Sequence, residues 1–198
     1  MRSSGIMKEK FAKFIRIVTV PPVMVTALIV ILCIMRNDIF TSAIDVVLSL
    51  IFLALIPVLA YPFSILVPKI KEKGREGQRN LAFVLTAIGY VAIWLYGLLS
   101  ASNQNLLLIY TGYFLSVVIL LILNKLLKIR ASGHACSITG PIVFVSYFLG
   151  FKGLIAGIIT YALIFWASIT TKRHTPQEFV FGTATCIVSF MFSFLIIM

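Results

Sequence analysis

LLLIYTGYFLSVVILLIL, residues 106–123, contains no charged side chain. A bilayer core about 30 Å thick takes roughly 20 helical residues at about 1.5 Å each, so this stretch predicts a membrane-spanning helix. Comparable stretches recur, and we expect spans at residues 17–35, 44–67, 81–98, 106–123, 137–149 (extended backwards), 154–169 and 179–198. The predicted fold is therefore all-α, a polytopic membrane helix bundle of six to seven transmembrane helices.

The composition also favours a chain that lies almost entirely in the membrane. Of the 198 residues, 61% are hydrophobic, and the mean hydropathy is +1.08. Because soluble domains are roughly half apolar, lipid is the expected solvent, and residues 1–198 are interpreted as a single integral membrane domain. The basic N-terminal segment precedes an apolar stretch without a small-residue cleavage site, so we expect that stretch to be retained as the first span.

The charged residues predict how the bundle is oriented. The formal net charge is +11, and nearly all Lys and Arg residues precede the first predicted span or follow the second, fourth or sixth. Only Arg36 and Lys152 fall on the opposite side. Since Lys and Arg accumulate in cytoplasmic loops, we expect a multi-pass cell-membrane protein with its N-terminus and basic loops in the cytoplasm. Contact with anionic membrane lipids explains this charge, and no nucleic-acid partner is expected.

The first of the two histidines in the sequence lies in Lys128-Ile-Arg130-Ala-Ser132-Gly133-His134, before the fifth span. Gly133 permits close approach to the backbone, and Ser132 can cap the helix or donate a hydrogen bond to an oxyanion. The backbone N–H groups at a helix start also favour an anion. The alternative is a capped helix start whose histidine faces lipid headgroups.

The second histidine lies in His174-Thr175-Pro176-Gln177-Glu178, on the same predicted side of the membrane. Thr175 and Glu178 have the spacing of a capping box, with Pro176 in the favoured first helical position, and this structural role alone can explain both residues. In a functional interpretation, the Glu178 carboxylate orients the His174 ring and raises its basicity.

Together the two segments resemble the type 2 phosphatidic acid phosphatase superfamily, whose members are membrane phosphatases or haloperoxidases. Its second motif ends in Pro-Ser-Gly-His, as in Ser132-Gly133-His134 here. Its third motif reads Ser-Arg, five residues, His, three residues, Asp, and His174 and Glu178 match its last two positions. The resemblance covers residues 125–182, and it implies a phosphatase-like core over about residues 106–198.

Further residues resemble the short prokaryotic members, and others depart from the motifs. Thr-Pro after the second histidine and Gly182 beyond it look similar, and Arg75-Glu-Gly-Gln-Arg79 gives weaker support. Ala131 replaces the proline of the second motif, and Glu178 stands where aspartate is usual. The Ser-Arg pair falls on Ala167-Ser168, so the phosphate-binding arginine of that motif is absent, and the first motif, Lys followed six residues later by Arg-Pro, is not present in strict form.

The resemblance implies covalent phosphoryl transfer from a lipid phosphate or an isoprenyl (di)phosphate. His174 would form a phosphohistidine with help from Glu178, and His134 would protonate the leaving oxygen and then activate water. The implied substrate-binding residues are those of the two basic loops: Arg130, Lys128, Lys125, Ser132, Gly133 and Arg173. The missing motif arginine motivates a rival interpretation, a non-enzymatic protein of the same fold that binds or transports lipid phosphates.

Other classes fit the sequence less well. No acidic cluster is available to hold magnesium, and Cys33, Cys136 and Cys186 lack metal-ligand spacing, so we expect a route without metal or cofactor. A metal-dependent lipid synthase is disfavoured because no loop carries paired aspartates. A transporter of unrelated fold is disfavoured because nothing suggests inverted repeats. The substrate's headgroup and tail and the oligomeric state are left open.

Overall fold

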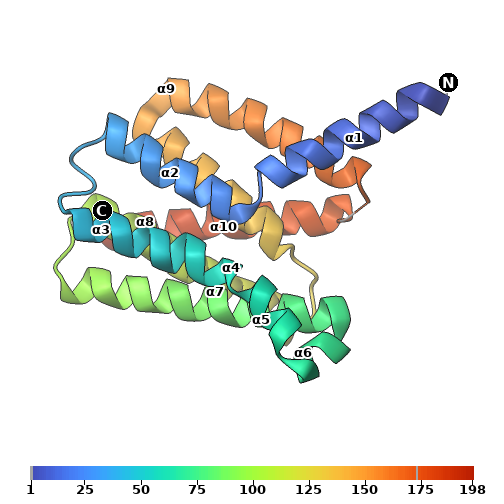
Figure 1. Ribbon diagram of the computed structural model, residues 1–198. Coiled ribbons are helices and arrows are strands. Elements are labelled where there is room, and N and C mark those ends of the chain that lie inside the picture. Colours follow the sequence, from blue (N-terminus) through green and yellow to red (C-terminus); the bar gives the residue numbers. More distant parts are fainter. Residues whose placement is uncertain (1, 173) are drawn as a thin grey trace.

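The computed structural model describes residues 2–172 and 174–198, and every regular element within them is helical (Figure 1). In chain order the elements are α1 (Arg2–Val18), α2 (Pro21–Met35), α3 (Ala43–Ser49), η1 (Leu50–Leu55), α4 (Ile56–Val58), α5 (Ala60–Leu66), α6 (Pro68–Glu72), α7 (Gly74–Leu99), α8 (Gln104–Leu121), η2 (Ile122–Leu126), α9 (Gly133–Thr170) and α10 (Pro176–Ile197). The η elements are π-helical turns that continue their neighbours.

The predicted all-α membrane bundle is confirmed. Within the described residues, five helical stretches are long and apolar enough to cross a membrane: Ala43–Leu66, Glu76–Leu99, Gln104–Leu126, Gly133–Thr170 and Pro176–Ile197. The bent pair Met7–Val18 and Pro21–Met35 makes a sixth such stretch if it acts as one span. The chain is therefore a multi-pass membrane protein.

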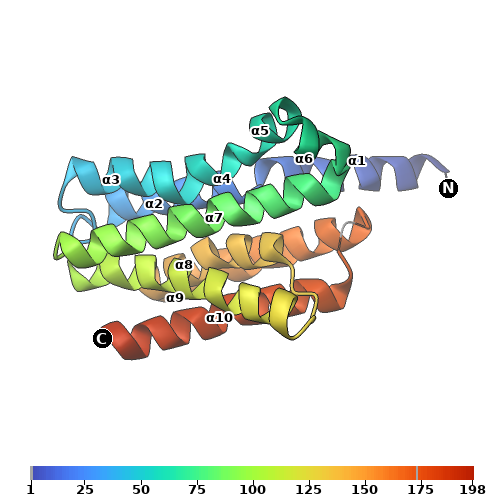
Figure 2. The ribbon, with the colours of Figure 1, turned by 90° about the horizontal axis from the view of Figure 1, so that it is seen from below.

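The helix α9 is a hairpin of two arms, 133–149 and 151–170, which correspond to the fifth and sixth predicted spans. Its 38 residues would extend about 57 Å as one rod, far longer than a bilayer core about 30 Å thick. Gly150 breaks it with φ 61° and ψ −139°, a conformation open to glycine. A Cβ on Gly153 would collide with the Val145 carbonyl oxygen, so the two arms pack closely. Both views show α9 folding back on itself (Figures 1 and 2).

The first predicted span is wrong as a single helix, because the structure divides it into α1 and α2. Val20 is extended, with φ −62° and ψ 149°, as expected for a residue before proline. The chain then bends by 56° between Val18 and Pro21. The 15 residues of α2 are short for a span, whereas α1 is an amphipathic helix that carries Lys and Arg beside exposed Phe11 and Phe14.

The basic loops gather at one end of the bundle, as the charge pattern predicts. The α1–α2 bend, the region of α6, the loop between η2 and α9 and the loop before α10 all lie at this end, to the right in Figure 1. The loops after α2 and α7, the Gly150 turn and the C-terminus lie at the opposite end. Figure 2 shows the same division from below. We refer to these as the histidine end and the Arg36 end.

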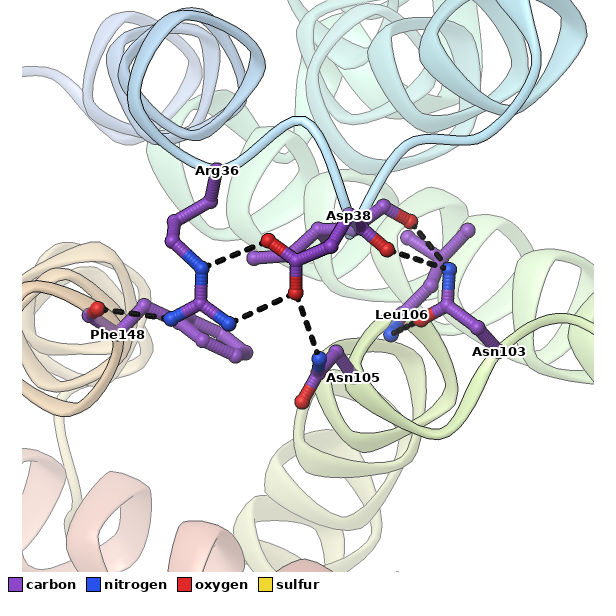
Figure 3. Close-up of polar contacts among 7 residues, drawn as sticks. Arg36, Asp38, Asn103, Asn105, Leu106 and Phe148 are labelled. Carbon is purple, nitrogen blue, oxygen red and sulfur yellow. Dashed lines mark hydrogen bonds and ion pairs between the residues drawn. The ribbon is translucent and has the colours of Figure 1, made fainter.

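At the Arg36 end, a polar network joins three loops (Figure 3). The Arg36 guanidinium donates to both carboxylate oxygens of Asp38, each at 2.8 Å, and to the Phe148 carbonyl oxygen at 3.0 Å. Asn105 donates to Asp38 at 3.2 Å, and Asn103 donates to the carbonyl oxygens of residues 38 and 39. This network fastens the α2–α3 loop to the start of α8 and to the tip of the α9 hairpin.

The two largest clusters of buried apolar residues within the described part of the chain hold most of the helices together. The larger cluster lies between α2, η1, α7, α8 and the first arm of α9, and includes Leu28, Leu53, Ile93, Tyr110 and Phe144. The second cluster joins α1, both arms of α9 and the start of α10: Ala12, Ile15, Ala135, Ile138, Ile164, Ala167 and Phe179. Because Ala135 follows His134, the second cluster positions the histidine end.

Candidate functional site

The loop that carries the Ser-Gly-His sequence is shaped by a side chain of η2, the element that continues α8. Asn124 donates to the carbonyl oxygens of Leu120 and Ala131 at 3.0 and 3.1 Å, and its own oxygen accepts from the Ala131 N–H at 3.1 Å. Lys128, with φ 56°, turns the chain between them. These bonds pair the backbone N–H and carbonyl groups of Ala131, and they fix the position of Ser132 at the start of α9.

Ser132 joins α9 to α10. Its hydroxyl oxygen accepts a hydrogen bond from the Ala135 N–H at 3.1 Å, so the predicted helix cap is present. Its own N–H donates to the Glu178 carbonyl oxygen at 2.9 Å. The opposing residue on α10 is Gly182, where any Cβ would collide with the Ser132 carbonyl oxygen. Only glycine therefore lets α10 approach this loop, and the approach brings the two predicted segments together.

The two histidines meet at this junction. The ring centroids of His134 and His174 lie 5.8 Å apart, and the ring planes are 18° from parallel. Both side chains are partly buried, with 22% of the His174 side chain exposed. At this separation both imidazoles can contact one small anion. The structure thus brings together two residues that the sequence places in different loops.

Glu178 has the predicted capping role and also lies beside His174. Thr175 accepts from the Glu178 N–H at 3.2 Å, and Glu178 Oε2 accepts from the Thr175 N–H at 3.2 Å, which completes the capping box. The same Oε2 atom lies 3.9 Å from Nδ1 of His174. This separation is too long for a hydrogen bond but falls within ion-pair distance when the ring is protonated. Nδ1 is therefore the ring nitrogen on the carboxylate side, and Nε2 is on the opposite side of the ring.

The other predicted binding residues that the structure describes differ in their exposure. Exposed side chains include Lys125 in η2 and both Lys128 and Arg130 on the loop that follows it. Arg173 lies outside the described residues. Gly133 is exposed, and the one atom near its added Cβ is a Leu120 methyl carbon at 3.8 Å, so packing within the chain does not require glycine there. An uncrowded backbone at a helix start suits an anion.

The position of the missing motif arginine is closed to solvent. Ser168 is fully buried, and among the described residues its hydroxyl has no hydrogen-bond partner. Within the same residues, no group of three or more His, Cys, Asp or Glu side chains is placed to hold a metal ion.

Comparison of the chain with models of protein families, with curated proteins and with solved structures returns no match. The site must therefore be interpreted from its own residues.

Sequence reasoning missed three contributors. Asn124 and Gly182 shape the junction, and Arg16 of α1 lies close enough to His134 for their charges to interact. Asn and Gly have many roles in loops and helices, so only the fold shows what these two contact. Arg16 was counted with the basic residues before the first span; its spacing of four from the small Ala12 is the one signal that places it on the packed face of a helix.

Proposed function

We propose that this protein is a membrane-embedded phosphatase that hydrolyses a lipid phosphate or an isoprenyl (di)phosphate through a phosphohistidine intermediate. The observation that carries the proposal is the meeting of His134, His174 and Glu178 at the basic end of a membrane bundle. Ionisable groups at membrane depth are unfavourable without a use, and here three of them lie close together.

In the proposed reaction, Nε2 of His174 attacks phosphorus, and the bond from phosphorus to the leaving oxygen breaks. The Glu178 carboxylate, 3.9 Å from Nδ1, stabilises the positive charge that the ring gains. His134, which takes up a proton when the phosphate anion binds beside it, gives that proton to the leaving oxygen. It then removes one from water as that water attacks the phosphohistidine and the bond from phosphorus to His174 breaks. Inorganic phosphate leaves, and both imidazoles return to their starting protonation.

The electrostatics of the histidine end support binding of a phosphate group. The backbone N–H groups at the start of α9, beside Gly133, favour negative charge. Basic residues precede each histidine in the sequence and add positive charge: Lys125, Lys128, Arg130 and Arg173. A substrate whose tail stays in the bilayer can present its headgroup at this depth. We further propose that this end faces the cytoplasm, because the basic residues gather there.

One observation favours a second candidate, a protein that binds lipid phosphates without hydrolysing them. Position 168 holds a buried serine where the resembling family has a phosphate-binding arginine. The second candidate has the same ligand class and the same site, so affinity alone does not separate the two.

Release of inorganic phosphate separates them. The protein in phospholipid vesicles would receive phosphatidate, a polyprenyl phosphate or a polyprenyl diphosphate, with and without a chelator. We expect release from at least one of these, unchanged by the chelator. Binding of a non-hydrolysable phosphonate lipid without release from any substrate would favour the binder. Loss of release in chelator, restored by magnesium, would contradict the metal-independent route.

A further inference from the structure

The amphipathic helix α1 packs directly over the candidate site. Its buried residues Ala12 and Ile15 belong to one cluster with Ala135 and Ala167 of α9. Ala135 is the neighbour of His134, and Ala167 is the neighbour of Ser168. One face of α1 therefore lies beside both the first histidine and the position where the resembling motif has arginine.

Arg16 is on this same face of α1. It follows the fully buried Ala12 by four residues, which is about one helical turn. Its side chain is partly buried, and its Nε atom is shielded from solvent. The guanidinium lies close enough to the His134 ring for the two charges to interact. Arg16 is therefore less exposed to solvent than Lys128 of the neighbouring loop.

We propose that Arg16 binds the phosphoryl group at the two histidines and supplies the guanidinium that position 168 lacks. This inference rests on the proposed function for the identity of the ligand. A guanidinium near the His134 ring repels the protonated form of that ring, and an anion bound between the two removes that repulsion. The planar fork of arginine donates two parallel hydrogen bonds to phosphate oxygens, which a lysine cannot do.

Side-chain contacts between α1 and the second arm of α9 hold the helix, and with it Arg16, in position. Phe11 lies 6.1 Å, centroid to centroid, from Trp166 on the second arm of α9, and Nζ of Lys8 lies 6.0 Å from the same ring. Exposed Phe14 and Ile17 suit an apolar membrane boundary. Since α1 is anchored on the arm that carries Ser168, the two elements hold their relative position. The arginine comes from the N-terminal helix instead of from α9.

Arg16→Gln, Arg16→Lys and Lys13→Gln test the assignment. Lys13 is the matched control, because it lies on the same helix with 62% of its side chain exposed and pairs with Glu9 at 3.0 Å. Two quantities are measured in vesicles: kcat/KM for phosphate release, and the affinity for a phosphonate analogue of phosphatidate. Thermal unfolding temperatures are measured on the same samples.

We expect Arg16→Gln to lower both quantities by about 100-fold or more, as removal of a key oxyanion donor does. Arg16→Lys keeps the charge and loses the fork, so a loss of about tenfold is expected. Lys13→Gln should change either quantity by less than about threefold, because an exposed ion pair contributes little.

The outcomes separate this inference from the proposed function. If the wild type binds the phosphonate but releases no phosphate, and Arg16→Gln weakens that binding, the phosphatase proposal fails and the role of Arg16 stands. Equal values for Arg16→Gln and Lys13→Gln in both assays would overturn the inference. Full binding by Arg16→Lys, with a lowered unfolding temperature in Arg16→Gln, would show that the charge only holds α1 in place, which also contradicts it.

Discussion

The two ends of the bundle use their charged residues in opposite ways. At the Arg36 end, Arg36 and Asp38 share two hydrogen bonds of 2.8 Å, and neighbouring amides bind the remaining polar atoms (Figure 3). At the histidine end, basic residues far outnumber acidic ones, and Glu178 stays 3.9 Å from His174. At the first end, the charged groups of Arg36 and Asp38 are paired with each other within the chain. The second has more basic than acidic residues, and we propose that it binds an external anion.

The largest effect should come from the proposed nucleophile. His174→Ala should abolish phosphate release, because the covalent route has no substitute for the imidazole. Far-ultraviolet circular dichroism and thermal unfolding would show whether the bundle is retained. Release at the wild-type rate from a folded variant would contradict the assignment of His174.

The effect of His134→Ala should depend on the leaving group. Hydrolysis of a lipid phosphate, whose alkoxide is a poor leaving group, should slow by about 100-fold or more, as expected for loss of a general acid. An activated aryl phosphate needs no proton on its leaving oxygen, so its cleavage should fall much less. The measurement is the ratio of the two rates in the variant and the wild type. An unchanged ratio would assign His134 a role other than acid catalysis.

Glu178→Gln separates capping from catalysis. Glutamine keeps most of the capping geometry and removes the charge near Nδ1 of His174. A catalytic role predicts a rate loss of about 100-fold or more with the fold preserved. A capping role alone predicts near-normal turnover and a stability loss of about 1 kcal/mol. Turnover and the free energy of unfolding, measured on one sample, distinguish them.

The smallest effect on activity should come from the Arg36 end. Hydrogen bonds from Arg36 are the main cause that lowers the pKa of Asp38 to about 2. A lowered pKa means that the stabilising ion pair is complete above the unfolded-state value near 4 and is lost as pH falls through about 2. Between pH 7 and 5 this end should not respond to pH. Asp38→Asn should lower the unfolding temperature and leave kcat/KM within about twofold, because distant sites act independently. A large loss of kcat/KM would show that the two ends are coupled.

Much of the fold follows from the sequence, because lipid demands long uncharged stretches and the charges cluster between them. Residues 106–123 lie within one helical stretch as expected. The bend between α1 and α2 was missed, although Pro21 marks it, since apolar length alone cannot distinguish one helix from two. The helix caps at Ser132 and Thr175 could be predicted from the spacing of nearby residues in the sequence. Local spacing gave no sign that Gly182 meets Ser132 or that Arg16 lies near His134, because both arrangements depend on how α1, α9 and α10 pack.

The most direct test of the histidine end is to trap the covalent intermediate. The protein in vesicles would be mixed with a lipid phosphate that carries labelled phosphorus and quenched with alkali, in which phosphohistidine survives. We expect label on the peptide that contains His174, none in His174→Ala, and unchanged labelling in Asp38→Asn. Phosphate release by the wild type with no labelled protein, or equal labelling of His174→Ala, would contradict the account.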